Sequence, residues 1–272
     1  MIINPLIVFA EAEKPHVSLA AEELFSVGGL SITNSMLLGI VGYILTISLL
    51  VYVSRAVMRG KKVNKVVIGV QWLFEGLLHT AEDVIGKKDI ARKVAPLCIT
   101  LFFLIVINYW LGILPFVGEA LTYDGTPLFR SLNADLNLTF ALAIISMVMA
   151  QIYAIKVHGV FGNAQRYLRN PLKDPTGAFE GILEFIAEFS RGTALSLRLF
   201  GNVFAGEVLL MMVGYLSGFA SPLALPAFMA FEIFMGLIQG YVFFMLAIVF
   251  TSLAVADHGH NDEHTSSAKA HA

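Results

Sequence analysis

Charge is scarce in this sequence. Asp, Glu, Lys and Arg make up 14% of its 272 residues, and 57% of the residues are hydrophobic. A soluble domain carries about 25% charged residues. The formal net charge of −2 gives no reason to expect a nucleic-acid partner. This composition excludes an ordinary globular domain and indicates an all-α integral membrane protein.

Cysteine and recognisable cofactor motifs are also lacking. Cys98 is the only cysteine, so no disulfide can form within the chain, and its apolar surroundings favour a packing thiol. No glycine loop of the Walker type is present, and we expect no cofactor or metal. Four histidines lie in the small, polar segment 257–272, which we interpret as a disordered cytoplasmic tail rather than a metal site.

Long apolar runs dominate what is present. About 20 apolar residues cross a bilayer as a helix. Five runs qualify, at about 34–54, 95–117, 136–156, 179–216 and 224–256, within a membrane domain over 34–256. The last two runs exceed one straight crossing. The Gly- and Pro-containing link 217–222 predicts that they form a long, tilted antiparallel hairpin. Segment 1–33 is expected to be extra-cytoplasmic, although its apolar start resembles a short signal sequence.

Basic residues predict the orientation. They cluster after the first run, before the second and after the third, whereas segment 118–135 has three acidic residues and only Arg130. The positive-inside rule then puts the N-terminus outside and the C-terminus in the cytoplasm. Segment 65–86 has apolar residues at helical spacing with polar ones between, so we expect an amphipathic helix along the cytoplasmic interface. A sixth crossing is the alternative.

Arg198 is the residue that composition does not explain. It lies in the nearly uncharged run 193–205, and a guanidinium cannot discharge. Placing it at the centre of a spanning helix costs about 2.5 to 3.5 kcal/mol, so such a residue is a functional hypothesis by default. An ion pair with Glu188 or Glu207 is the structural alternative. Both lie two or three turns away along the helix, too far for easy pairing.

Other polar residues accompany Arg198 on the last two runs. Glu232 and Gln239 are seven apart and point the same way. If Arg198 is level with Gln239, Glu207 comes near Glu232. However, nine residues turn a straight helix by about 180°, so Glu207 would point away from the Arg198 face unless the helix is distorted. Structural alternatives remain: a salt bridge between Glu188 and Arg191, protonated carboxyls at Glu207 and Glu232, and a packing amide at Gln239.

A long motif makes these residues recognisable. The stretch from Ser196 to Glu207, Ser-Leu-Arg-Leu-Phe-Gly-Asn-Val-Phe-Ala-Gly-Glu, closely resembles the signature of subunit a of the bacterial F-type ATP synthase membrane sector. Asp135-Leu-Asn-Leu-Thr139, Asn170-Pro171, Glu184 fourteen residues before Arg198, and Gln239 agree with it. The likeness covers about residues 30 to 256.

The resemblance implies the stator of a rotary proton path in a bacterial cytoplasmic membrane. The family's essential arginine would be Arg198, facing a carboxylate of the rotor. The implied partners are a ring of c subunits and the b-subunit peripheral stalk. The outer half-channel would use Asn202, Glu207, Glu232, Gln239 and Asp135, and the inner one Glu184, Glu188 and Ser196. Some family members have histidine in place of Glu232, so an exchange of roles between Glu207 and Glu232 stays open.

Other functional classes fit the sequence less well. A secondary transporter would also need intramembrane charges, but it usually shows two related halves, and no internal repeat is visible. An intramembrane protease would need paired aspartates, a Ser–His pair or a zinc motif within the runs. A purely structural anchor would not need Arg198.

Overall fold

A computed structural model describes residue 18 and residues 21–27, 30–59, 64–114, 118–123, 126–167 and 175–256. Most of the expected N-terminal segment, the motif residues Asn170 and Pro171, and the expected tail 257–272 lie outside the described residues.

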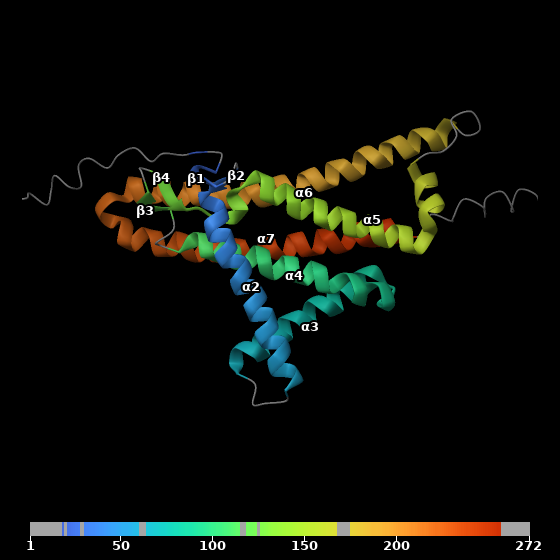
Figure 1. Ribbon diagram of the computed structural model, residues 1–272, viewed down its shortest axis with the longest axis horizontal. Coiled ribbons are helices and arrows are strands. Elements are labelled where there is room, and N and C mark those ends of the chain that lie inside the picture. Colours follow the sequence, from blue (N-terminus) through green and yellow to red (C-terminus); the bar gives the residue numbers. More distant parts are fainter. Residues whose placement is uncertain are drawn as a thin grey trace, which may run out of the picture.

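Long helices make up nearly all of the described chain (Figure 1). They are α2 (Asn34–Met58), α3 (Lys65–Ile85), α4 (Lys88–Ile113), α5 (Leu136–Tyr167), α6 (Pro175–Ser217) and α7 (Ser221–Val255), with the short 3-10 turns η1 (Leu132–Ala134) and η2 (Gly218–Ala220). Two antiparallel hairpins, β1 (Glu23–Val27) with β2 (Leu30–Thr33) and β3 (Gly118–Tyr123) with β4 (Thr126–Phe129), precede α2 and α5. The expected all-α membrane class is confirmed, and these small hairpins are an addition that the apolar runs did not predict.

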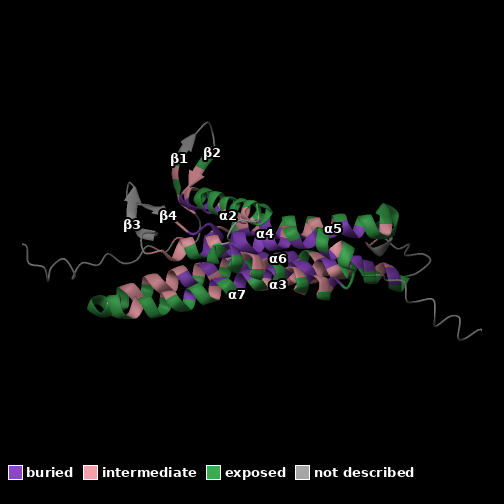
Figure 2. Ribbon diagram, turned by 90° about the horizontal axis from the view of Figure 1, so that it is seen from below, coloured by how far each residue is buried: buried purple, intermediate pink, exposed green. Residues whose placement is uncertain are grey.

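Helix α4 forms the centre of the packing. It lies along α7, while α5, α6 and α7 contact one another, and α2 runs away from this group toward α3 (Figure 1). Buried residues concentrate on α4 (Figure 2). The largest fully buried apolar side chains come mainly from α4, α6 and α7: Phe102, Phe243, Phe244, Ile99, Ile105, Leu195, Leu199 and Ile248. Cys98 is buried among them, as a packing thiol should be.

Helices α6 and α7 form the hairpin that the link between them predicts. Gly218 has φ of 47°, a left-handed conformation that glycine adopts without steric cost. Pro222 lies in the first turn of α7, where its missing N–H costs nothing. The two helices therefore return side by side, which places residues far apart in sequence opposite each other.

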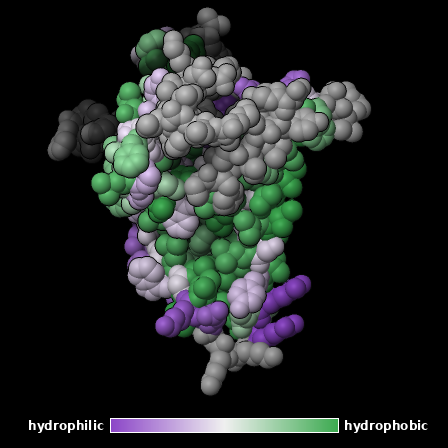
Figure 3. Space-filling model, turned by 90° about the vertical axis from the view of Figure 1, so that its left-hand side faces the viewer, coloured by the Kyte–Doolittle hydropathy of each residue, from purple (hydrophilic) through white to green (hydrophobic). Residues whose placement is uncertain are grey.

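The outer surface is largely apolar. Many large side chains are exposed on α2, α5, α6 and α7, such as Ile44, Ile47, Phe185 and Phe189, and apolar residues cover much of the face in Figure 3. Among the described residues, four stretches are long and apolar enough to span a membrane: Asn34–Met58, Lys88–Ile113, Leu136–Ala164 and Pro175–Val255, the last covering both α6 and α7. Such surfaces require lipid or partner helices around them.

Helix α3 is not among these stretches. Its buried residues Leu77 and Ala81 belong to the cluster formed with α4 and α7, and Ser252 Oγ of α7 donates to the Val84 carbonyl at 3.1 Å. On the opposite side Trp72 is exposed. The helix is thus amphipathic as expected, and its location at the cytoplasmic interface stays a prediction.

Candidate functional site

Arg198 lies on an outward face of α6. Its neighbours Leu195 and Leu199 are buried in the core, whereas Arg198 itself is exposed. Within the described residues it makes no hydrogen bond or ion pair. The structural alternative of an ion pair with Glu188 or Glu207 is therefore not what the chain forms. The guanidinium is presented away from the protein's own core, on a surface that no described part of the chain pairs with.

One turn further along α6, Asn202 meets Gln239 of α7. Asn202 Nδ2 donates to Gln239 Oε1 at 2.6 Å. Gln239 is only 2% exposed, and its Nε2 is sealed from solvent without an acceptor in the described part of the chain. This contact is one turn from the predicted register, in which Arg198 was level with Gln239.

Glu232 lies deeper between the helices. It is 4% exposed, and its Oε2 accepts a hydrogen bond from the Tyr109 hydroxyl of α4 at 2.7 Å. The Gly206 backbone of α6 lies directly against the Glu232 carboxylate, and Gly236 lies against the Tyr109 ring. The carboxyl group thus has a neutral hydrogen-bond donor and one glycine as close neighbours, and the second glycine lies against the donor's ring.

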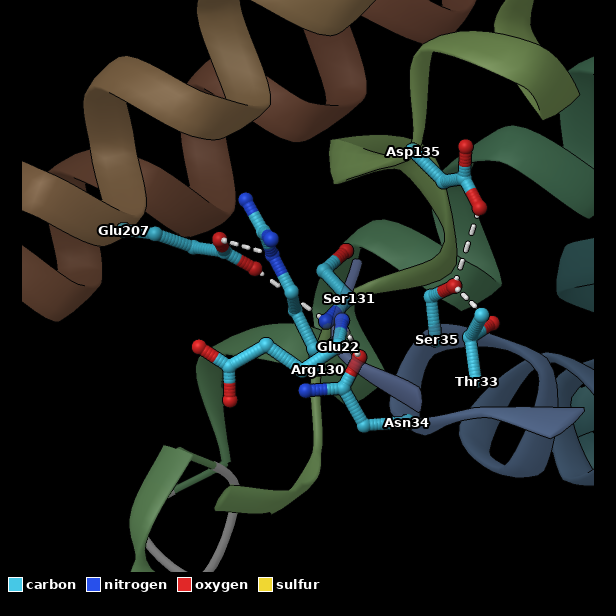
Figure 4. Close-up of polar contacts among 8 residues, drawn as sticks. All are labelled: Glu22, Thr33, Asn34, Ser35, Arg130, Ser131, Asp135 and Glu207. Atoms are coloured by element: carbon cyan, nitrogen blue, oxygen red, sulfur yellow. Dashed lines mark hydrogen bonds and ion pairs between the residues drawn. The ribbon is translucent and has the colours of Figure 1, made fainter. Parts of the chain in front are cut away.

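Glu207 has different partners. Its Oε2 lies 3.5 Å from Arg130 Nε, and its Oε1 accepts the Ser131 N–H at 3.1 Å (Figure 4). The Arg130 guanidinium also lies over the Phe204 ring, at 5.9 Å from the ring centre. The predicted meeting of Glu207 with Glu232 is not seen as a direct contact. The rotation of about 180° between Arg198 and Glu207 along a straight helix agrees with this, because Glu207 points toward Arg130 and Ser131, before η1.

Asp135 links two helix starts near this cluster. Its Oδ1 accepts the Asn137 N–H at 2.9 Å, which caps α5. Its Oδ2 accepts the Ser35 hydroxyl at 3.0 Å, and Ser35 contacts Thr33 (Figure 4). These contacts tie the beginning of α2 to the beginning of α5.

The carboxylates expected on the inner side have separate partners. Glu184 Oε1 lies 3.2 Å from Arg191 Nη2. Glu188 accepts hydrogen bonds from Gln151 and Tyr167 of α5. The expected salt bridge between Glu188 and Arg191 is therefore wrong. Arg191 instead pairs with Glu184, one turn before Glu188. Glu188 has its hydrogen-bond partners on the neighbouring helix α5.

Ser196 does not join these carboxylates. Its hydroxyl donates to Thr139 Oγ1 at 3.1 Å, in the first turn of α5. Glu188, by contrast, meets α5 near its other end, where the non-helical Gly159 (φ 75°) bends the helix and Asn163 donates to Gln151 at 3.0 Å. The structure therefore divides the three expected inner residues into separate contacts.

Tyr109, Arg130 and Ser131 were missed at the sequence level. Arg130 had one signal, since it is the only basic residue of segment 118–135. Tyr109 and Ser131 had none, because their partners come from helices about 75 to 125 residues later. In the described ranges no group of three or more His, Cys, Asp or Glu could hold a metal ion. What the hairpin does offer is a series of proton-binding and hydrogen-bonding groups beside an exposed cation.

Known proteins have sequences similar to this one. The family model described as ATP synthase A chain matches residues 36–252. ATP synthase subunit a of Mycobacterium bovis is 31% identical over 69% of this chain and 74% of that protein. Subunit a of Acidothermus cellulolyticus is 31% identical over 72% and 69%, and ATP synthase subunit a 2 of Chlorobaculum tepidum is 27% identical over 96% and 72%. The resemblance found from the motif around Arg198 is confirmed.

Proposed function

Because this chain belongs to the ATP synthase A chain family, we propose that it guides protons past Arg198 and so couples their flow to rotation of a neighbouring ring. Membership of the family makes it a non-catalytic, multi-pass component of the membrane sector of the bacterial F-type ATP synthase, where it takes part in proton transport and ATP synthesis with the other subunits. The mechanism, the paths and the individual partners are the proposal.

The observation that carries the proposal is that Arg198 is exposed and has no hydrogen-bond or ion-pair partner in the described part of the chain. A carboxylic acid can face lipid when neutral, but a carboxylate there is strongly penalised. A rotor carboxyl must therefore be protonated before it leaves the stator. Beside Arg198 the opposite charge favours the ionised form. The cation thus promotes proton loss on one side and, because it does not titrate, blocks direct leakage between the two paths.

The contact of Gln239 with Asn202 is further support for the Arg198 face of α6 as the rotor contact. The buried Nε2 of Gln239 is a donor with no acceptor in the described residues, and an unmatched buried donor costs about 1–3 kcal/mol. Asn202 holds its other end at 2.6 Å. Asn202 shares the Arg198 face of α6, so this hydrogen bond anchors to α7 the face that a rotor carboxylate would pass.

Two offset paths would serve this point. Asn202, Glu207, Glu232, Gln239 and Asp135 would deliver protons from outside. Glu184, Glu188 and Ser196 would help to release them to the cytoplasm. One charge moving through 100 mV releases about 2.3 kcal/mol, so several protons are needed for each ATP.

The partners would be the c-subunit ring at the Arg198 face and the b-subunit peripheral stalk elsewhere. The chain would cross the membrane five times, with the N-terminus outside, α3 on the cytoplasmic surface and the C-terminus inside. The separation of acidic and basic segments supports this orientation.

Substitution of Arg198 tests the proposal. We expect Arg198→Ala to abolish ATP-driven proton pumping in inverted membrane vesicles while the complex still assembles. Arg198→Lys should fail too, because a compact, titratable ammonium does not replace a guanidinium. Arg92→Ala is the matched control, since Arg92 is an exposed arginine paired with Glu82 at 2.7 Å, remote from α6 in sequence and contacts. Pumping by Arg198→Ala within about twofold of the control would overturn the proposal.

A further inference from the structure

We propose that Tyr109 is a positioning residue of the outer path, whose hydroxyl holds the Glu232 carboxyl group in the place where it takes up and releases the transferred proton. The inference rests on the proposed function and adds a residue from α4 that the motif around Arg198 does not include.

Tyr109 and Glu232 form a buried hydrogen bond between two helices. Tyr109 is 3% exposed and Glu232 is 4% exposed, and they come from α4 and α7, 123 residues apart. The phenol donates to Oε2 at 2.7 Å, a length typical of an O–H donor on a carboxylate. Within the described residues Oε1 accepts no hydrogen bond. One oxygen is thus held, and the other remains for the proton.

Two glycines give the pair its space. A Cβ added at Gly206 would lie 2.7 Å from Cδ of Glu232, and one added at Gly236 would lie 2.7 Å from Cδ1 of Tyr109. Both distances are shorter than real Cβ contacts. Any side chain at either position would displace the carboxyl group or the ring, so the packing of α4, α6 and α7 accommodates this hydrogen bond specifically.

The choice of partner separates Glu232 from Glu207. Glu207 Oε2 lies 3.5 Å from Nε of the Arg130 guanidinium, which carries a charge. Tyr109 offers a hydrogen bond without a charge. In the described residues Glu232 has no ion-pair partner, so a neutral donor alone positions its carboxyl group.

Glu232 takes up one proton and releases one proton in each transfer. A proton from the outer aqueous side forms an O–H bond with Oε1 and converts the carboxylate into the neutral acid. The same O–H bond then breaks, and the proton, relayed by water molecules along the face of α7 that carries Gln239 about 10 Å away, forms a new O–H bond with the rotor carboxylate beside Arg198. Tyr109 keeps its own proton throughout.

Removal of one hydroxyl tests this role in the intact, reconstituted ATP synthase. Tyr109→Phe keeps the ring that packs on Gly236 and loses only the donor. Tyr153→Phe is the matched control, because Tyr153 is also a buried tyrosine with one hydrogen bond, from its hydroxyl to the Lys93 carbonyl at 3.1 Å. The rate of ATP synthesis is measured while the pH on the outer side is varied at constant potential.

We expect Tyr109→Phe to lower the maximal rate at least fivefold and to change how the rate depends on the outer pH, because the carboxyl group that takes up the proton has lost the hydrogen bond that positions it. Tyr153→Phe should change neither. In a Glu232→Gln background, Tyr109→Phe should cause no further loss. A rate within twofold of the parent, a loss without displacement of the pH profile, or an equal loss in the Glu232→Gln background would each contradict the inference.

The Arg198→Ala variant separates the two proposals. If Arg198→Ala is inactive and Tyr109→Phe behaves like Tyr153→Phe, only the role of Tyr109 is wrong. If Arg198→Ala still synthesises ATP, the proposed function itself fails.

Discussion

Gly206→Ala is the substitution for which the structure gives the sharpest expectation. Gly206 is buried on α6, and an added Cβ would overlap the Glu232 carboxylate. The new methyl group cannot be accommodated unless the carboxyl group moves or α6 and α7 separate. Either change breaks the hydrogen bond from Tyr109 to Glu232.

The effect on stability and the effect on function differ in size. Overpacking costs about 1–3 kcal/mol, and alanine in place of glycine returns about 1 kcal/mol of helix propensity. The net loss of stability is thus about 2 kcal/mol at most. A hydrogen bond to a charged group is worth about 1.5–3 kcal/mol, which corresponds to about a 10- to 150-fold loss of rate.

Gly214→Ala provides the comparison on the same helix. A Cβ at Gly214 would lie 3.9 Å from the two δ carbons of Leu225, an ordinary van der Waals distance. We expect this variant to assemble and pump protons like the parent. ATP-driven proton pumping by the two variants, in membranes with matched amounts of complex, is the assay. Equal pumping by Gly206→Ala and Gly214→Ala would refute the packing argument at Glu232.

Two further predictions concern single charges. Glu207→Gln and Glu232→Gln should each slow proton transport more than they affect assembly, and unchanged transport in the double variant would remove both from the path. In α3, which is not among the candidate membrane spans, the hydrogen bond from Arg92 lowers the pKa of Glu82 below its ordinary 4.5. The resulting stabilisation is present above that pH and is lost as the pH falls through the lowered value. Arg92→Ala should therefore increase hydrogen exchange between α3 and α4 at pH 7 but not near pH 3, and equal effects at both would count against the contact.

The helices were predictable because a chain that faces lipid must be both apolar and helical. The apolar runs marked the parts suited to lipid rather than the helix ends. Helix α4 begins at Lys88, although its apolar run was placed from 95, because the charged first turn continues the same backbone hydrogen bonding. The hairpin of α6 and α7 followed from the Gly and Pro residues of the link.

The pairing of polar groups was less predictable. Sequence spacing along one helix suggested that Glu188 pairs with Arg191, but its partners come from α5, 37 and 21 residues earlier. For the same reason, the sequence did not predict that Tyr109 is the hydrogen-bond partner of Glu232. Helical spacing determines which residues share a face, whereas the partner on that face depends on how other helices pack.

The central claim is that the Arg198 guanidinium meets a carboxylate of the rotor. The most direct measurement is a density map of the assembled complex that resolves side chains around α6. The account predicts a rotor helix against the Arg198 face, with one carboxylate within about 4 Å of the guanidinium in at least one rotational state. A map in which Arg198 is bound to a carboxylate of its own chain, with lipid alone covering that face, would contradict it.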